Sequence, residues 1–260
     1  MAEIRTVLVI GGSGSVGRVV VDELTRRGAS VRVLVREGSK GGFPATTDVR
    51  VGDITDPVAF DGVLDGVDAV VFTHGANGTP KQNEAVDYGV VRNLLAARNG
   101  ELRISLMTTV GVTDHTIGYN QTSQVCDWKR RAERLVRASG LPYTIVRPGW
   151  FDYNADDEHQ VVFRQGDQFT SGDATDGVVA RQQIAEVLVD ALYNDAATWK
   201  TLELVAEKGP VRADLTDSFG ALDADVAGSV NGSHDRETLP LADEPERVLA
   251  DLDAIRRPRA

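Results

Sequence analysis

A glycine-rich turn close to the N-terminus offers the clearest chemistry in this sequence. It follows directly on an apolar run at residues 4–10, and a helical apolar pattern begins right after it and stops at Gly28. The residues of this turn that are candidates for contact with a cofactor are Gly11, Gly14, Ser15, Val16 and Gly17. A glycine at 11 or 12 lets the chain leave a strand sharply, the one at 14 lets backbone approach a pyrophosphate, and the one at 17 lets the helix pack closely. Because free N–H groups at a helix start attract anions, the turn predicts a dinucleotide-binding site.

The residue after the second predicted strand indicates which dinucleotide is bound. That strand covers residues 30–35 and ends at Arg36. An acidic residue at this place usually holds the ribose hydroxyls of NAD, whereas an arginine accommodates the 2′-phosphate of NADP. Lys40 follows closely and adds to the positive charge, although the adjacent Glu37 would suit NAD. The sequence favours NADP.

The composition excludes several classes of partner. The chain of 260 residues is 42% apolar, which is enough for a large core, and no apolar run is as long as a membrane span. A net charge of −11 opposes binding to nucleic acid or to an anionic membrane. The single cysteine, Cys126, excludes an internal disulfide, and no histidines stand at metal-ligand spacing. We expect a cytoplasmic protein with a small-molecule substrate and without a metal, and we leave a homodimer open.

The elements that must position the turn alternate along the chain. Apolar runs predict further strands at residues 49–51, 68–73, 102–107, 143–146 and 201–205. Periodic apolar positions predict helices at residues 57–64, 82–98, 127–139 and 183–193, with Asp56 as the cap of the first. Such alternation is typical of a Rossmann-type α/β fold, a doubly wound parallel sheet covered on both faces. We therefore predict a single domain over residues 1–222.

Two segments depart from this alternation. Residues 155–177 are polar and rich in Asp and Gly, which predicts a loop beside the active site with a short hairpin near 161–163. We place substrate-side segments at about 150–180. From residue 223 the chain is acidic and rich in turns, with a helix predicted at 244–255. This C-terminal tail could wrap on the domain or on a partner subunit, or it could be disordered.

Several motifs occur in an order that resembles a known family. They are the glycine turn 11–17, Arg36, the sequence GDITD at 52–56, VDYG at 86–89 with Asn93, WKRRAE at 128–133, and SGLPYTIVRPG at 139–149. Over residues 4–205 the chain resembles the atypical short-chain dehydrogenase/reductase superfamily, in particular its compact NADP-binding, NmrA-like branch. The resemblance implies that Asp53 and Ile54 flank the adenine. It also implies that Thr73, His74 and Gly75 line the cofactor groove, and that Pro148 and Gly149 pass near the nicotinamide.

The catalytic motif of that superfamily is incomplete in this chain. Its dehydrogenases use Tyr-x-x-x-Lys on a helix, where the lysine lowers the pKa of the tyrosine and holds the nicotinamide ribose. Lys129 matches the lysine, but Val125 stands in place of the tyrosine and has no proton to give. Thr108 or Thr109, after a strand, would polarise a carbonyl.

Three substitutes for the missing acid remain open: Tyr119, His115 or a water molecule. Hydride transfer to a conjugated or quinone-like acceptor needs a strong acid least. Two hypotheses for the function therefore remain: an NADP-dependent reductase of a small carbonyl, enone or quinone, and a non-catalytic NADP-binding redox sensor or scaffold. Three other groups we expect to be structural or solvated. These are the arginines at 130, 131, 134 and 137, the acidic run 156–158, and Cys126.

Overall fold

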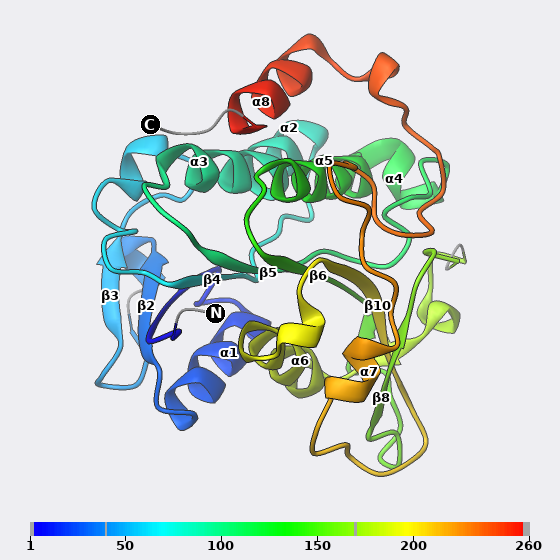
Figure 1. The fold of residues 1–260 in the computed structure, drawn as a ribbon, viewed down its shortest axis with the longest axis horizontal. Helices are drawn as coiled ribbons and strands as arrows, with labels where there is room; N and C mark the ends of the chain where they lie inside the picture. The colour runs from blue at the N-terminus through cyan, green and yellow to red at the C-terminus, as the bar shows by residue number, and fades with distance from the viewer. Residues whose placement is uncertain (1–2, 40, 169–170, 257–260) are drawn as a thin grey trace.

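An eight-stranded sheet forms the middle layer of the molecule (Figure 1). The computed structural model describes residues 3–39, 41–168 and 171–256. The strands of this sheet, in chain order, are β1 (Thr6–Ile10), β2 (Ser30–Val35), β3 (Asp48–Val51), β4 (Ala69–Phe72), β5 (Arg103–Met107), β6 (Tyr143–Pro148), β8 (Gln160–Arg164) and β10 (Lys200–Glu207). Their spatial order is β3-β2-β1-β4-β5-β6-β10-β8, and only β8 pairs antiparallel with its neighbour. This order confirms the predicted Rossmann-type fold.

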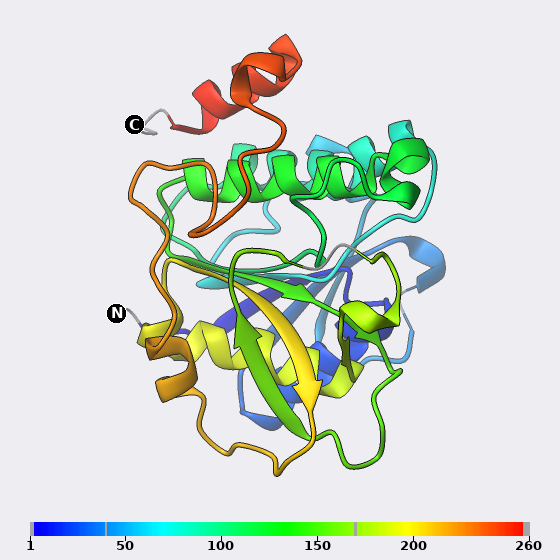
Figure 2. The same cartoon turned by 90° about the vertical axis from the view of Figure 1, so that its right-hand side faces the viewer.

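Helices cover both faces of the sheet (Figures 1 and 2). One face carries α1 (Ser15–Arg26), α6 (Arg181–Tyr193) and the short α7 (Thr216–Gly220). The other face carries α2 (Pro80–Asn83), α3 (Gly89–Ala97), α4 (Gly118–Ser123), α5 (Val125–Ala138) and α8 (Glu246–Arg256). Short 3-10 helices lie at Glu37–Ser39, Pro57–Phe60, Ala174–Asp176, Asp195–Ala197 and Leu241–Asp243, and a π-helical turn lies at Glu84–Tyr88. Alternation along β1 supplies both cores, since Leu8 packs under α3 and α5 whereas Val9 packs under α1 and α6.

The strand order sets where a ligand can bind. β1 and β4 are neighbours, yet the chain leaves β1 toward β2 on one side and returns to β4 on the other. The carboxyl ends of β1 and β4 therefore meet at a switch point, where the two connections diverge and open a crevice. A small parallel sheet of β7 (Trp150–Phe151) and β9 (Val178–Val179) lies after β6, within the predicted substrate-side segments.

Three predicted elements differ in detail from the structure. The helix predicted at 57–64 is a 3-10 turn that stops at Phe60, because Asp61 is extended and Gly62 has a φ of +68°. Its predicted cap is confirmed, since Asp56 accepts a hydrogen bond from the backbone N–H of Val58. The predicted helix 82–98 contains the π-helical turn. The hairpin predicted near 161–163 is wrong, because β8 pairs with the later strand β10.

The C-terminal segment crosses from the face of α7 to the opposite face and ends as α8 (Figure 2). Val248, Leu252 and Ile255 of α8 are buried against the outer side of α3 and α5, away from the sheet (Figure 1). On its way this segment covers a buried set of charged side chains, here called the arginine network: Arg130, Arg131, Arg134, Arg137 and Arg147 with Glu133, Glu203, Asp225, Asp235 and Glu244. Of the predicted basic face of α5, residues 131, 134 and 137 are ion-paired there, whereas Arg130 donates to Thr238, to Asn231 and to the carbonyl oxygen of residue 236. In the part of the chain that the structure describes, no helix combines the length and the apolarity needed to span a bilayer.

Candidate functional site

The glycine turn has the geometry that a phosphate site requires. Gly11 has a φ of +84°, and a Cβ there would lie 2.5 Å from the backbone nitrogen of His74. A Cβ on Gly17 would lie 2.1 Å from the carbonyl oxygen of Gly11, so α1 packs directly on the turn. Gly14 is the N-cap of α1 and has no side chain to occupy the first N–H groups of the helix. These N–H groups fit the pyrophosphate of a dinucleotide, and Ser15 lies exposed beside them.

The residues predicted to contact the adenosine end lie at the same edge of the sheet. Arg36 follows β2 and is exposed, and Asp53 follows the neighbouring strand β3. The backbone N–H and the hydroxyl of Thr55 donate to Asp53, and together with the charge of Arg36 they lower the pKa of that carboxyl. Ile54 is half-buried and packs on the core. Lys40 lies outside the described residues.

A cleft of about 810 Å³ opens beyond the ends of β4, β5 and β6. Four of the predicted site residues line it: Thr109, Tyr119, Lys129 and Gly149. Val125 is also in the wall, so the side chain that replaces the usual tyrosine faces the cleft. The remaining lining residues are Asn77, Gly78, Val110, Thr122, Ser123, Trp150, Phe151, Asp152, Tyr153 and Arg181.

Lys129 is held at the cleft by a buried carboxylate. Its Nζ donates to Oδ1 of Asp87 at 2.6 Å, and the two side chains are 13% and 1% exposed. A Cβ on Gly75 would lie 3.2 Å from Nζ of Lys129, which places the ammonium next to the predicted cofactor groove. Burial raises the pKa of Asp87 above its usual range, and the charge of Lys129 opposes that rise. Asp87 stands in the π-helical turn, a local irregularity often found at functional sites.

The two candidate threonines have different surroundings. The hydroxyl of Thr108 donates to Oε1 of Glu133 at 2.7 Å, inside the arginine network. Thr109 is half-buried and lines the cleft. The hydroxyl of Thr109 is therefore the one within reach of a substrate in the cleft.

The candidate acids differ from the usual tyrosine. Tyr119 lines the cleft, and Sγ of Cys126 donates to its hydroxyl at 3.6 Å. Burial raises the pKa of Tyr119 above its usual range, so this phenol is a weaker acid than an ordinary tyrosine. His115 is mostly exposed, and its Nδ1 lies 3.0 Å from the carboxylate of Asp127 rather than in the cleft wall.

The side chains of residues 73 and 74, which the resemblance places at the cofactor groove, are buried and do not line the cleft. The hydroxyl of Thr73 donates to the carbonyl oxygen of Ile10 and ties β4 to β1. His74 is buried, and burial together with the nearby Lys129 charge lowers its pKa to about 3. Its ring is therefore neutral near pH 7. Pro148 accepts a backbone hydrogen bond from Val110, and a Cβ on Gly149 would lie 2.4 Å from the carbonyl oxygen of Gly177.

Three residues of the site carried no predicted role. Asp87 lies in one of the quoted motifs, and its proximity to Lys129 gives it a function that the motif alone did not indicate. Asp152 and Arg181 join the cleft through the fold, since they are 29 residues apart and Arg181 also reaches Ser15. The aromatic side chains after Gly149 were within the predicted substrate-side segments.

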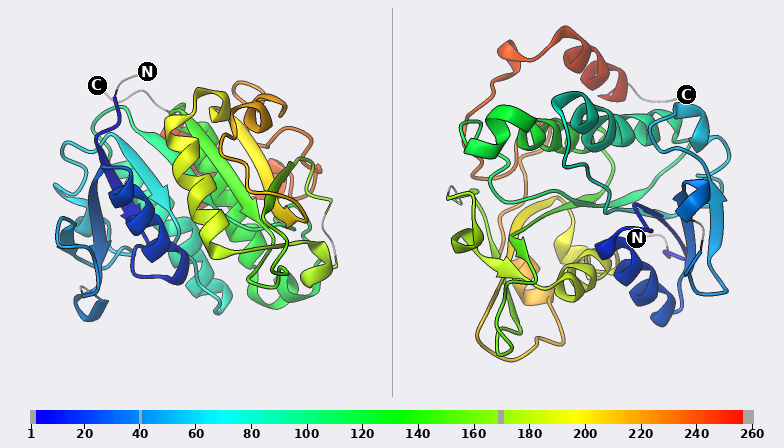
Figure 3. Two further views of the ribbon diagram at one scale, coloured as in Figure 1. Left: turned by 90° about the horizontal axis from the view of Figure 1, so that it is seen from below. Right: turned by 180° about the vertical axis from the view of Figure 1, so that it is seen from behind.

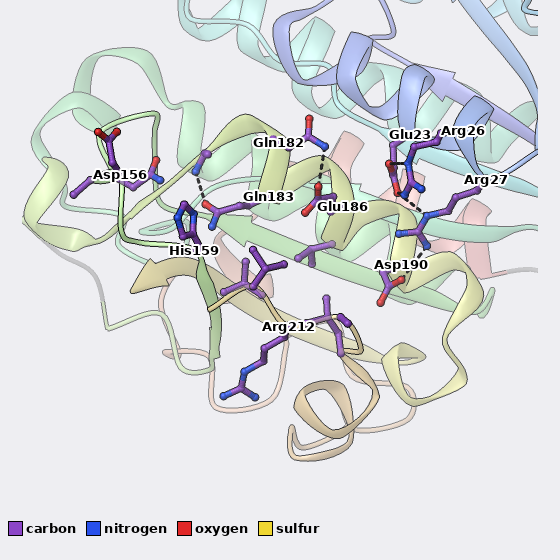
Figure 4. A pocket seen from close by; sticks show the side chains of 18 residues that line it. Glu23, Arg26, Arg27, Asp156, His159, Gln182, Gln183, Glu186, Asp190 and Arg212 are labelled. Atoms are coloured by element: carbon purple, nitrogen blue, oxygen red, sulfur yellow. Dashed lines mark hydrogen bonds and ion pairs between the residues drawn. The ribbon is translucent and has the colours of Figure 1, made fainter. Parts of the chain in front are cut away.

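A second hollow of about 550 Å³ lies on the other side of α6 (Figure 4). Its charged side chains pair largely with one another: Glu23 accepts hydrogen bonds from Arg26 and Arg27, and Arg27 also binds Asp190. The hollow is lined by neither Lys129 nor the glycine turn. The cleft beyond β4, β5 and β6 is therefore the candidate functional site.

Comparison with known proteins finds relatives and solved structures of NAD(P)H-binding proteins and oxidoreductases. Sanguinarine reductase of Eschscholzia californica is 26% identical over 264 residues, which cover 85% of this chain and 96% of that protein. The solved oxidoreductase YlbE of Lactococcus lactis matches with a TM-score of 0.65 and 16% identity, over 84% of this chain and 96% of that one. A short-chain dehydrogenase/reductase of Veillonella parvula, solved in complex with NADP, matches with a TM-score of 0.58 and 16% identity, over 78% of this chain and 95% of that one. A family model described as NAD(P)H-binding matches residues 11–195, and the chain therefore belongs to this NAD(P)H-binding family.

Proposed function

We propose that the protein is an NADPH-dependent reductase of a small organic acceptor, with quinones favoured over enones and simple carbonyl compounds. The observation that carries this proposal is the pair of residues in the cleft wall: Lys129 is kept and held by Asp87, whereas Val125 replaces the phenol. The relationship to sanguinarine reductase supports a reductase. Arg36 supports NADP rather than NAD.

The chain would hold the dinucleotide at three places. The N–H groups of the glycine turn would hold the pyrophosphate, Arg36 and Asp53 the adenosine end, and Lys129 the nicotinamide ribose. NADPH bound there would supply a hydride. Asp87 accepts a hydrogen bond from the Lys129 ammonium, and this ammonium would contribute a charge-assisted hydrogen bond to a ribose hydroxyl.

The acceptor is limited by the weakness of the available acids. Val125 cannot donate a proton, and the raised pKa of Tyr119 makes it a poor donor. A quinone that takes up a hydride gives a phenolate stabilised by its ring, and this product can take its proton from water. A simple ketone gives an alkoxide, which needs an acid in the site.

The wall of the cleft also suits a flat acceptor. Trp150, Phe151 and Tyr153 line it, and so does Val110. Aromatic side chains stack on planar rings. Thr109 would hydrogen-bond an oxygen of the acceptor.

The test is NADPH oxidation with quinones, enones and aromatic ketones at matched concentrations. We expect quinones to be reduced fastest and simple ketones slowest. Tight NADPH binding without turnover on any acceptor would favour the alternative, a redox sensor or scaffold of the NmrA-like type, for which Val125 is the supporting observation.

A further inference from the structure

Arg181 links the glycine turn to the wall of the cleft. It is the first residue of α6, and its Nε donates to Oγ of Ser15 at 2.9 Å. Its guanidinium also pairs with the carboxylate of Asp152, and its backbone N–H donates to Oδ1 of Asp152 at 2.9 Å. One cation is thus bound to the first residue of α1 and to the segment that carries the aromatic side chains.

The packing of two helices brings Arg181 next to Ser15. α1 and α6 lie side by side on the same face of the sheet (Figure 3), and they form one of the most extensive contacts between elements of the fold. The hydrogen bond between Ser15 and Arg181 joins their first residues, so the two helix starts are adjacent. Both helices exceed three turns, so the positive ends of both helix dipoles lie at this place.

The ion pair between Arg181 and Asp152 is weak enough for Arg181 to exchange this carboxylate for another anion. The two side chains are 36% and 47% exposed, and ion pairs at such exposure contribute little to stability. A guanidinium binds a phosphate by two parallel, charge-assisted hydrogen bonds, which are stronger. Asp152 has a φ of +58°, and its backbone N–H donates to the carbonyl oxygen of Val179, so its backbone is held without Arg181.

We propose that Arg181 is a pyrophosphate-binding residue that exchanges Asp152 for the cofactor. Binding of the dinucleotide then frees the carboxylate of Asp152, while the backbone of Trp150–Phe151 stays paired with β9. The charge on the substrate side of the cleft therefore responds to occupation of the cofactor side. This inference rests on the NAD(P)H binding that defines the family and extends the proposed function. It does not require that the protein reduce any particular acceptor.

Affinity for two dinucleotides separates Arg181 from Arg36. Because NADPH and NADH share the pyrophosphate, Arg181→Met should weaken both by about tenfold or more in fluorescence or calorimetric titrations. Arg181→Lys keeps the positive charge but loses the two parallel N–H donors of the guanidinium. Its affinities for both cofactors should therefore lie between those of wild type and those of Arg181→Met. Arg5→Met removes an exposed arginine that precedes β1, at the opposite end of that strand, and should change neither affinity. Loss confined to NADPH, or affinities within twofold of wild type, would overturn the proposal.

Asp152→Asn tests the exchange itself. Asparagine tolerates the positive φ and still accepts the backbone N–H of Arg181, but it removes the competing charge. We expect NADPH to bind severalfold more tightly at low salt, and we expect this gain to vanish in the Arg181→Met background. Weakened binding in Asp152→Asn, or an equal gain in both backgrounds, would contradict the exchange. These affinities are measured without substrate, so lack of turnover would overturn the reductase proposal and leave them unaffected.

Discussion

Helix α5 carries cations on two sides, and the molecule surrounds them differently. Under the C-terminal segment, Arg134 and Arg137 have side chains that are only 1% exposed, and each has several acceptors. On the cleft side, Lys129 is 13% exposed and pairs with Asp87 next to open space. Burial with several hydrogen-bond acceptors therefore distinguishes the structural cations of this helix from Lys129, which has one carboxylate partner beside a cleft.

The largest loss of stability is expected from a substitution within the arginine network. Arg147 is fully buried between Glu133, Glu203 and Asp235. Arg147→Met would leave Glu203 without the cation that pairs with it and would leave Arg137 as the remaining cation beside Glu133 and Asp235, and breaking a buried pair costs about 3–5 kcal/mol. Denaturant unfolding should show this loss, while NADPH affinity of the folded variant at low temperature should stay near that of wild type. A loss below about 1 kcal/mol would mean that the arginine network does not stabilise the fold.

The pH dependence of stability gives a second test of the arginine network. Burial raises the pKa of Glu203 to about 7 in the folded protein, above its ordinary value of 4.5. A carboxyl with a raised pKa binds a proton more tightly when folded, so its contribution favours folding at low pH and is lost as pH rises toward 7. The difference corresponds to a few kcal/mol, on the order of 3.

Glu203→Gln isolates this contribution. Relative to the variant, wild type should become less stable as pH rises from about 5 to 8 in a series of denaturant unfolding curves. Parallel curves for the two proteins would show that Glu203 is already ionised at pH 5. The lowered pKa values of Glu133 and Asp235 act in the opposite sense and weaken both proteins below about pH 4.

A substitution at the predicted adenosine end tests the functional side of the comparison. Arg36→Asp should weaken NADPH about tenfold or more, because the substitution removes a partner of the 2′-phosphate and adds a repelling charge, and it should leave NADH within a few-fold. Titration with both cofactors measures the ratio. Arg50→Met, in the exposed edge strand β3, is a matched control for surface charge. Equal losses for both cofactors would contradict the assignment of Arg36.

The sequence predicted best what depends on neighbours along the chain. The glycine turn is complete within residues 11–17, and Val125 and Lys129 stand one helical turn apart, so both features are visible without the fold. The bond between Arg181 and Ser15 spans 166 residues and depends on α1 packing against α6. The partners of Arg130 and Arg134 lie about a hundred residues downstream, in a segment with little periodicity. The π-helical turn changes the phase of the helix at Asp87, which no regular helical pattern predicts.

The account depends most on Lys129 acting through the cofactor rather than as a proton donor. The most direct measurement is NADPH affinity and the pH profile of turnover for Lys129→Met, with the double variant Lys129→Met, Asp87→Asn as the control that leaves no unpaired buried carboxylate. We expect both variants to bind NADPH about tenfold or more weakly and to turn over more slowly at every pH, with the shape of the profile unchanged. Wild-type affinity combined with a shifted pH profile would contradict the account and would make Lys129 the proton donor.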